Sequence, residues 1–274
     1  MERFDDAWLR LREPIDHRAR ASTLVERLSN AWRAAGWSRV ADLGSGAGSN
    51  LRYLDARLPG VEDWILVEQD PDHVARLGAV TPRSGRVGVR AENLAASALD
   101  RVWSANLVTA AALLDLVSEG WLRRLVDACV EARAAALFVL SYDGQVRWRR
   151  AAGAESLEMT GLDQRVLDAV NRHQRRDKGF GPALGPLAGA RAERLFREAG
   201  FQTWLAPSPW RLGASDVELT RRLVAGWREV AAAAEPGRVA ELARWADGRV
   251  GEVAAGALAV EVGHVDLLAL PGRR

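Results

Sequence analysis

The chain of 274 residues has a single cysteine, Cys129, and no long apolar run. One cysteine cannot form a disulfide within the chain, which excludes a disulfide-stabilised fold and favours a reducing compartment. No stretch reaches the ~18 consecutive apolar residues that a membrane-spanning helix needs. The first residues, MERFDDAWLRLREP, are charged and lack the apolar core of a secretory signal. These absences predict a cytoplasmic protein with no membrane partner.

Signals for metal and for nucleic acid are missing as well. The four histidines and one cysteine do not cluster at the spacings that hold a metal ion. A formal net charge of +2 gives no general attraction to nucleic acid. Apolar residues make up 48% and charged residues 27%, as in an ordinary globular chain. We therefore predict no metal and disfavour a nucleic-acid partner; the sequence indicates no oligomeric state.

Apolar runs of strand length alternate with helical patterns along most of the chain. The expected strands are 39–44, 63–70, 86–91, 105–111, 134–144, 201–207 and 257–271. The expected helices are 4–12, 16–35, 49–58, 71–78, 118–133, 189–199, 215–234 and 237–255, with Gly36 as the C-cap of the second. This alternation predicts an α/β fold, with a doubly wound, mostly parallel seven-stranded sheet whose last strand is antiparallel.

Three segments add to this alternation within a single domain, 1–274. An amino-terminal helical segment, 1–36, precedes the first strand, and helical cap insertions are expected at about 143–188 and 207–256. Open α/β sheets bind ligands beyond the carboxyl ends of their strands. We therefore expect the three segments to cluster above that edge of the sheet.

The motif VADLGSGAGSNLRYL, residues 40–54, places three glycines between a strand and a helix. Such a turn lets the backbone approach a ligand at the amino end of a helix. Glu68 ends the next strand, twenty residues after Gly48, where a carboxylate can accept hydrogen bonds from the hydroxyls of a ribose. The dinucleotide fingerprint G-x-G-x-x-G does not fit, because position 49 is serine. The motif predicts a nucleoside site.

The form D-L-G-x-G-x-G resembles motif I of class I S-adenosylmethionine-dependent methyltransferases, and the resemblance extends over residues 38–141. It implies S-adenosylmethionine as the cofactor, with Glu68 on the ribose. It also implies that the remaining cofactor contacts come from the glycine turn and from the ends of the neighbouring strands, namely Asp42, Gly44, Ser45, Gly46, Gly48, Gln69, Asp70 and Thr109.

Two positions depart from the family pattern. Arg90 stands where the family has an acid near the adenine amino group, so Glu92 or Asn93 is expected to take its place. After the fourth strand, NLVTAAALLDLV resembles the family's segment near the transferred methyl group, with Asn106 in place of the common aspartate. Family members that methylate nucleobase amines carry Asn/Asp-Pro-Pro-Tyr/Phe there, so Thr-Ala-Ala-Ala at 109–112 disfavours that reaction.

The stretch NRHQRRDKGFGPALGP, residues 171–186, gathers groups that can hold an anion or move a proton, among them the only lysine of the chain. We interpret it as part of a cap over the substrate. The expected catalytic residues are His173, Lys178 and, at the end of the fifth strand, Tyr142. The expected substrate contacts are Asp143, Asn171, Arg172, Arg175 and Trp210. His17, His73 and His264 are interpreted as surface or packing residues.

The first functional hypothesis is O- or N-methylation of a small, anionic metabolite. Two alternatives stay open. Residues 147–178 hold eight basic residues against five acidic ones, with Trp148 among them, so this region could grip an RNA or protein substrate. The third hypothesis is a non-catalytic nucleoside-binding protein of the same fold. A steep salt dependence of substrate binding would favour the macromolecular alternative, and a failure to turn over the cofactor would favour the third.

Overall fold

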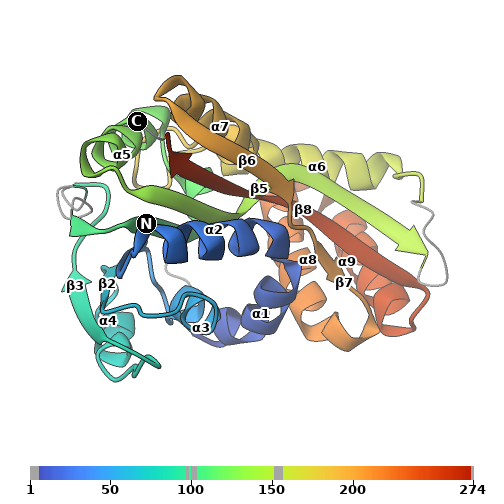
Figure 1. Ribbon diagram of the computed structural model, residues 1–274. Helices are drawn as coiled ribbons and strands as arrows, with labels where there is room; N and C mark the ends of the chain where they lie inside the picture. Colours follow the sequence, from blue (N-terminus) through green and yellow to red (C-terminus); the bar gives the residue numbers. More distant parts are fainter. Residues whose placement is uncertain (1–5, 97–98, 100–103, 151–156, 273–274) are drawn as a thin grey trace.

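A twisted sheet forms the centre of the protein in the computed structural model, which describes residues 6–96, 99, 104–150 and 157–272 (Figure 1). Within these residues the sheet has eight strands in the order β3-β2-β1-β4-β5-β8-β6, and β7 pairs with β8. The strands are β1 (Arg39–Leu43), β2 (Asp63–Glu68), β3 (Arg86–Ala91), β4 (Leu107–Ala111), β5 (Ala135–Arg150), β6 (Phe201–Pro207), β7 (Trp210–Leu212) and β8 (Leu258–Pro271). β1 to β5 are mutually parallel, and β8 is antiparallel to its neighbours. The predicted doubly wound fold with an antiparallel last strand is confirmed.

The number of strands differs from the prediction, because the short strand β7 was not expected. Pro207 and Pro209 flank the break between β6 and β7. Proline has no N–H to donate to a sheet, so the hydrogen-bond ladder to β8 is interrupted at this pair. The chain resumes pairing at Trp210, opposite Val262, and buries Trp210 and Leu212.

Helices cover both faces of the sheet (Figure 1). They are α1 (Asp6–Ala19), α2 (Ser22–Ala35), α3 (Ser49–Asp55), α4 (Pro71–Leu77), α5 (Glu119–Ala132), α6 (Gly161–Gln174), α7 (Ala188–Glu198), α8 (Val217–Ala234) and α9 (Val239–Ala254). One apolar core joins α2 and α3 to the sheet, and a second joins α5 and α7 to it. Cys129 is a free thiol buried in the second core.

The long strands β5 and β8 run beyond the rest of the sheet, where β5 contacts α6, β8 contacts α9, and α8 packs against both of these helices (Figure 1). β5 was expected to end near residue 144, but it continues to Arg150. Its second half alternates buried Val146 and Trp148 with more exposed neighbours, the pattern of a strand with one covered face. The first part of the segment 143–188 is therefore strand, and helix begins only at Gly161.

The predicted boundary between the first two helices is wrong. Pro14 lies inside α1, which continues to Ala19, and the chain breaks at Arg20 and Ala21 instead. At that point the backbone N–H of Ala21 donates to the carboxylate of Asp266 at 2.9 Å. A tertiary contact from β8, which no local pattern encodes, thus fixes where α2 begins. The start predicted at residue 4 lies outside the described residues.

No helix in the described ranges is long and apolar enough to cross a membrane. Nor does the part of the chain that the structure describes bring three or more His, Cys, Asp or Glu side chains together as a metal site would require.

Candidate functional site

The glycine turn after β1 is held in shape by backbone hydrogen bonds to β2. Gly44, Gly46 and Gly48 have φ values of 65°, 52° and 81°, in the left-handed region that glycine adopts readily. The amide groups of Gly44 and Ser45 donate to the carbonyl of Val67 at 2.9 and 3.1 Å. The turn therefore lies directly beside the carboxyl end of β2, where α3 begins.

The carboxylate of Glu68 ties this turn to the segment after β2. Its Oε2 accepts from the Gly46 amide at 2.8 Å, and its Oε1 accepts from the amides of Gln69 and Asp70 at 2.8 and 2.9 Å. A carboxylate has about four acceptor positions. Three are used by described residues, so Oε2 retains one position for a ligand hydroxyl.

Asp42 lies beneath the turn in a buried polar network. The Asn50 side-chain amide donates to Asp42 Oδ1 at 2.7 Å and to Thr109 Oγ1 at 3.0 Å. The Arg20 guanidinium donates to Asn50 Oδ1 at 2.5 Å. Asp42 Oδ2 has no hydrogen-bond partner among the described residues. Burial raises the pKa of Asp42 to about 6, although Asn50 and Ser45 act in the opposite direction.

We expect the free energy of unfolding of the ligand-free wild-type protein to fall by about 2 kcal/mol as the pH rises from about 4.5 to 7.5. The Asp42→Asn variant, which lacks the titrating carboxyl group, is the reference and should not show this fall. The pKa of Asp42 rises from its ordinary 3.8 to about 6 on folding. The folded protein therefore binds the Asp42 proton more tightly than the unfolded chain does. This proton stabilises the folded state fully below pH 3.8, the pKa of Asp42 in the unfolded chain, and the stabilisation is lost as the pH rises through about 6. Urea denaturation of both proteins across this range measures the difference. Parallel pH profiles would contradict it.

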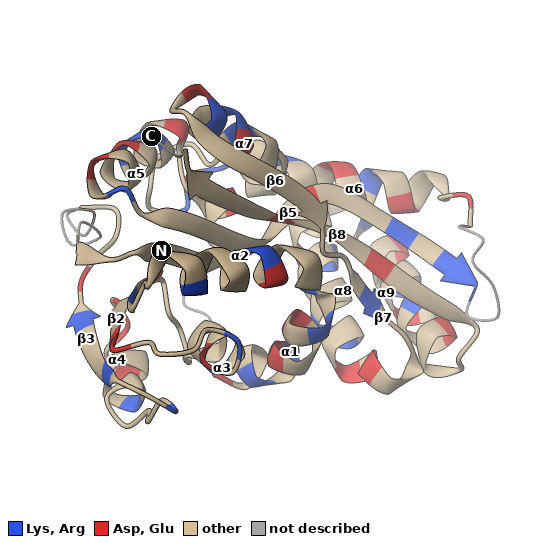
Figure 2. Ribbon diagram, in the orientation of Figure 1, with Lys and Arg blue, Asp and Glu red and all other residues tan. Residues whose placement is uncertain are grey.

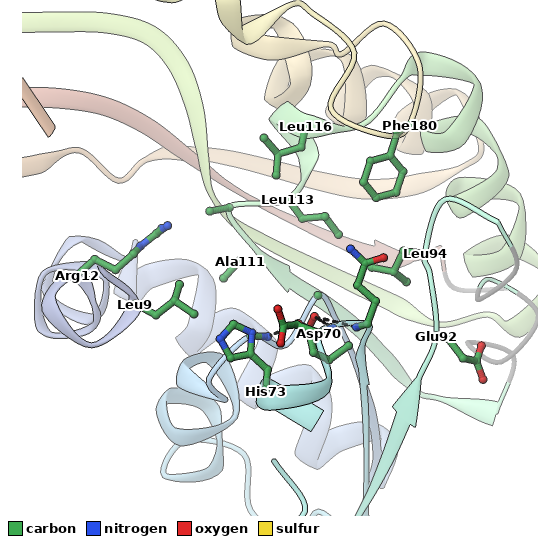
Figure 3. Close-up of a pocket in the computed structure, with 15 residues that line it drawn as sticks. Leu9, Arg12, Asp70, His73, Glu92, Leu94, Ala111, Leu113, Leu116 and Phe180 are labelled. Atoms are coloured by element: carbon green, nitrogen blue, oxygen red, sulfur yellow. Dashed lines mark hydrogen bonds between the residues drawn. The ribbon is translucent and has the colours of Figure 1, made fainter. Parts of the chain in front are cut away.

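A cavity opens on the carboxyl side of the sheet, above this turn (Figure 3). It contains about 800 Å³ of space not filled by protein atoms, part of it open to solvent. Its lining consists of Leu9, Arg12, Gly44, Gly46, Glu68, Gln69, Asp70, His73, Glu92, Leu94, Ala111, Ala112, Leu113, Leu116 and Phe180.

The cavity has two chemically different sides. Three carboxylates lie on the side of β2 and β3, and we call Glu68, Asp70 and Glu92 the acidic wall. Leu113, Leu116 and Phe180 lie together on the other side and form what we call the apolar wall (Figure 3). A charged or polar part of a ligand therefore fits near β2, and an apolar part fits beyond β4.

Helix α1 covers the cavity from the side opposite the apolar wall (Figure 3). Glu13 forms a two-pronged ion pair with Arg52 of α3, at 2.7 and 2.6 Å. At the start of α1, Asp6 lies 3.7 Å from His73 of α4 and pairs with Arg76. These contacts attach α1 to the two helices that follow β1 and β2.

The structure brings six of the eleven predicted cofactor residues to the cavity. Gly44, Gly46, Glu68, Gln69 and Glu92 line it, as does Asp70. The others lie behind or beside it: Asp42, Ser45 and Thr109 are buried, Gly48 faces Leu77 and Arg52, and the side-chain Oδ1 of Asn93 accepts from the Ala95 amide at 2.9 Å. Asn106 precedes β4 and caps the amino end of β1 through Ser38 and Arg39, so its predicted place near the transferred methyl group is wrong.

The predicted catalytic residues gather in a second group of polar side chains. Lys178 is buried, and its Nζ lies 3.3 Å from Nδ1 of His173. The Tyr142 hydroxyl donates to Asn171 Oδ1 at 3.0 Å, and Asn171 in turn donates to the carbonyl of Gly144. Burial raises the pKa of Tyr142 well above its ordinary value.

The predicted substrate contacts are dispersed. Arg172 and Arg175 are exposed at the end of α6, and Asp143 accepts from the Gln145 amide. Trp210 is buried and donates from Nε1 to Asp16 at 2.9 Å. Among the described residues that line the cavity, none of the eight predicted catalytic and substrate-binding residues appears. Their roles stay predictions.

Sequence reasoning missed the wall formed by α1 and the apolar wall. Leu9 and Arg12 are three residues apart, a spacing that places both on one face of a helix. Phe180 is the only Phe, Tyr or Trp in the stretch 171–186 and lies between two glycines. His73, interpreted as structural, also lines the cavity. These signals were present, but they do not reveal which segments meet.

Comparisons with known proteins give similarity to solved structures alone. No protein-family model matches the chain, and no curated protein matches it. The chain is similar to a cyclopropane synthase from Mycobacterium tuberculosis, with 14% identity, 97% of this chain and 94% of that one covered, and a TM-score of 0.44. It is also similar to magnesium protoporphyrin IX methyltransferase from Synechocystis, with 13% identity and a TM-score of 0.44. That match covers 74% of this chain and 86% of the other. Phosphoethanolamine N-methyltransferase 2 from Haemonchus contortus is a third similar structure, with 11% identity and a TM-score of 0.41. That match covers 86% of this chain and 49% of the other.

Proposed function

We propose that the protein binds S-adenosylmethionine in this cavity and transfers its methyl group to a small molecule. The observation that carries the proposal is the Glu68 carboxylate, which holds the Gly46 amide at 2.8 Å on the lining of the cavity and keeps one acceptor position for a ribose hydroxyl.

The charges of the cavity favour a cationic cofactor over a dinucleotide. A pyrophosphate needs free backbone N–H groups at a glycine turn. Here the amides of Gly44, Ser45 and Gly46 already donate to Val67 and Glu68. The acidic wall would repel the negatively charged pyrophosphate, whereas S-adenosylmethionine carries a net positive charge.

The chain's own residues would position and shield the reactants. S-adenosylmethionine, when bound, supplies an activated methyl group for in-line displacement. The apolar wall of Leu113, Leu116 and Phe180 excludes water from the side where an acceptor would approach. Helix α1 covers the cavity, which favours a small acceptor over a macromolecule.

The basic region 147–178 gives less support to a macromolecular substrate than its sequence suggests. Trp148 is fully buried, with the guanidinium of Arg249 over its ring. Arg147 and Arg149 both pair with Glu261, and basic bands on β5 lie beside an acidic band on β8 (Figure 2).

Two measurements test the proposed function. Calorimetry is expected to show S-adenosylmethionine binding at least about 10-fold tighter than NAD, or about 1.4 kcal/mol. With a methyl-labelled cofactor and a fractionated cell extract, the label is expected in small metabolites. Tighter NAD binding would overturn the cofactor assignment. Label in RNA or protein would favour the macromolecular alternative, and binding without any transfer would favour a non-catalytic protein.

A further inference from the structure

Arg12 reaches the cavity from α1 in a fixed orientation. Its Nε donates to Asp16 Oδ2 at 2.8 Å, and Nη2 lies 3.4 Å from Asp16 Oδ1. Its guanidinium lies over the ring of Trp210, 5.2 Å from the centroid. Trp210 in turn donates to Asp16, so the aromatic ring and the carboxylate hold the same guanidinium. The side chain of Arg12 is only 12% exposed.

The far edge of this guanidinium is available for a ligand. Nη1 has no hydrogen-bond partner among the described residues, and Nη2 has one donor position beyond its contact with Asp16. Arg12 projects from α1 toward the space between that helix and the apolar wall (Figure 3). A planar edge with two parallel N–H groups matches the two oxygens of a carboxylate or phosphate.

The neighbouring charges allow an anion at this position. Asp115 is buried, and its Oδ1 has no partner among the described residues. Burial raises the pKa of Asp115 to about 6, although the positive charges of Arg12 and Lys178 act to lower it. An arriving anion raises the pKa of Asp115 further, so that this carboxyl group can take up a proton and need not repel the ligand. Burial lowers the pKa of His264 to about 3, so His264 stays neutral.

We propose that Arg12 determines the substrate class by binding a carboxylate or phosphate group of the methyl acceptor, whose apolar part lies on Leu113, Leu116 and Phe180. This inference rests on the proposed function and deepens it. It places the anion site on α1 rather than at Arg172 and Arg175, which are exposed at the end of α6.

Three probes with the same apolar chain test the inference on protein saturated with S-adenosylhomocysteine: octanoate, octyl phosphate and the neutral octanol. We expect the better of the two acids to bind wild-type protein at least about 10-fold tighter than octanol, as a charge-assisted pair implies. The preferred acid distinguishes a carboxylate from a phosphate substrate. Equal binding of octanol and both acids would overturn the inference without any variant.

Variants then assign the preference to one residue. Arg12→Gln is expected to remove the preference for the acid while octanol and S-adenosylmethionine bind as before, and Arg12→Lys is expected to restore part of it. The matched control is Arg172→Gln, which is expected to change none of these affinities. An undiminished preference in Arg12→Gln would overturn the inference, and so would its loss in Arg172→Gln. Failure of wild-type protein to bind S-adenosylmethionine would instead overturn the proposed function.

Discussion

Glu68→Ala is expected to weaken binding of S-adenosylmethionine by at least about 100-fold, or about 2.7 kcal/mol. The substitution removes the proposed ribose contact. It also releases the amides of Gly46, Gln69 and Asp70, which the carboxylate holds at 2.8 to 2.9 Å. The glycine turn then loses the side chain that connects it to the end of β2. Titration calorimetry measures the change directly.

Two further variants separate charge from side-chain size. Glu68→Gln keeps the length of the side chain. Both oxygens of the Glu68 carboxylate accept hydrogen bonds from backbone N–H groups, so the NH₂ group of glutamine would face one of these donors and could not accept from it. We therefore expect a loss intermediate between wild type and Glu68→Ala. Glu62→Ala, an exposed glutamate immediately before β2, is the control and should bind the cofactor normally. Unchanged affinity in Glu68→Ala would remove the main support for a nucleoside site here.

Arg249→Leu is expected to lower the free energy of unfolding by about 3 kcal/mol, because it leaves a buried carboxylate without its charged partner. The side chain of Asp163 is 0% exposed. It accepts from Arg249 Nε at 3.0 Å, from Trp245 Nε1 at 2.8 Å and from the Thr160 amide at 2.8 Å. This pair joins the start of α6 to α9, so the loss should appear in chemical denaturation.

The pH dependence gives this prediction a distinctive signature. Burial raises the pKa of Asp163, but hydrogen bonds from Arg249, Trp245 and Thr160 outweigh burial and lower it below its ordinary value. The ionised Asp163 carboxylate therefore stabilises the folded state at pH values above its pKa in the unfolded chain. This stabilisation is lost as the pH falls through the lowered pKa of Asp163 in the folded protein. The difference between wild type and Arg249→Leu should therefore shrink toward about pH 3.

Controls on the same helix exclude a general effect of removing arginine. Arg244 is exposed on α9, and Arg244→Leu is expected to change stability by less than about 0.5 kcal/mol. Replacing both partners, Arg249→Leu with Asp163→Leu, should recover much of the loss, because no charge is then left buried alone. A loss as large in Arg244→Leu as in Arg249→Leu would contradict the assignment.

Local patterns predicted the elements that build the floor of the site. The sequence from Val40 to Leu54 contains a buried strand, a glycine turn and a helix start, and the structure has all three. Glu68 could be located because a parallel strand must end beside that turn. These features depend on neighbours in sequence and on the period of apolar residues, which are visible in one chain.

Features that depend on distant partners were not predictable in the same way. The first helix was predicted to end at residue 12, but the break lies at Arg20 and Ala21, where Asp266 from β8 accepts a hydrogen bond from the Ala21 amide. Arg12 and Phe180 lie far apart in sequence and line one cavity. Helical spacing shows which residues share a face, but it does not show which surface that face meets.

A crystal structure with S-adenosylhomocysteine shows directly whether this cavity is the cofactor site. We expect the ligand in the cavity above the glycine turn, with a ribose hydroxyl about 3 Å from Glu68 Oε2 and the sulfur directed toward the apolar wall of Leu113 and Leu116. A ligand bound elsewhere, or one whose ribose lies away from Glu68, would contradict it.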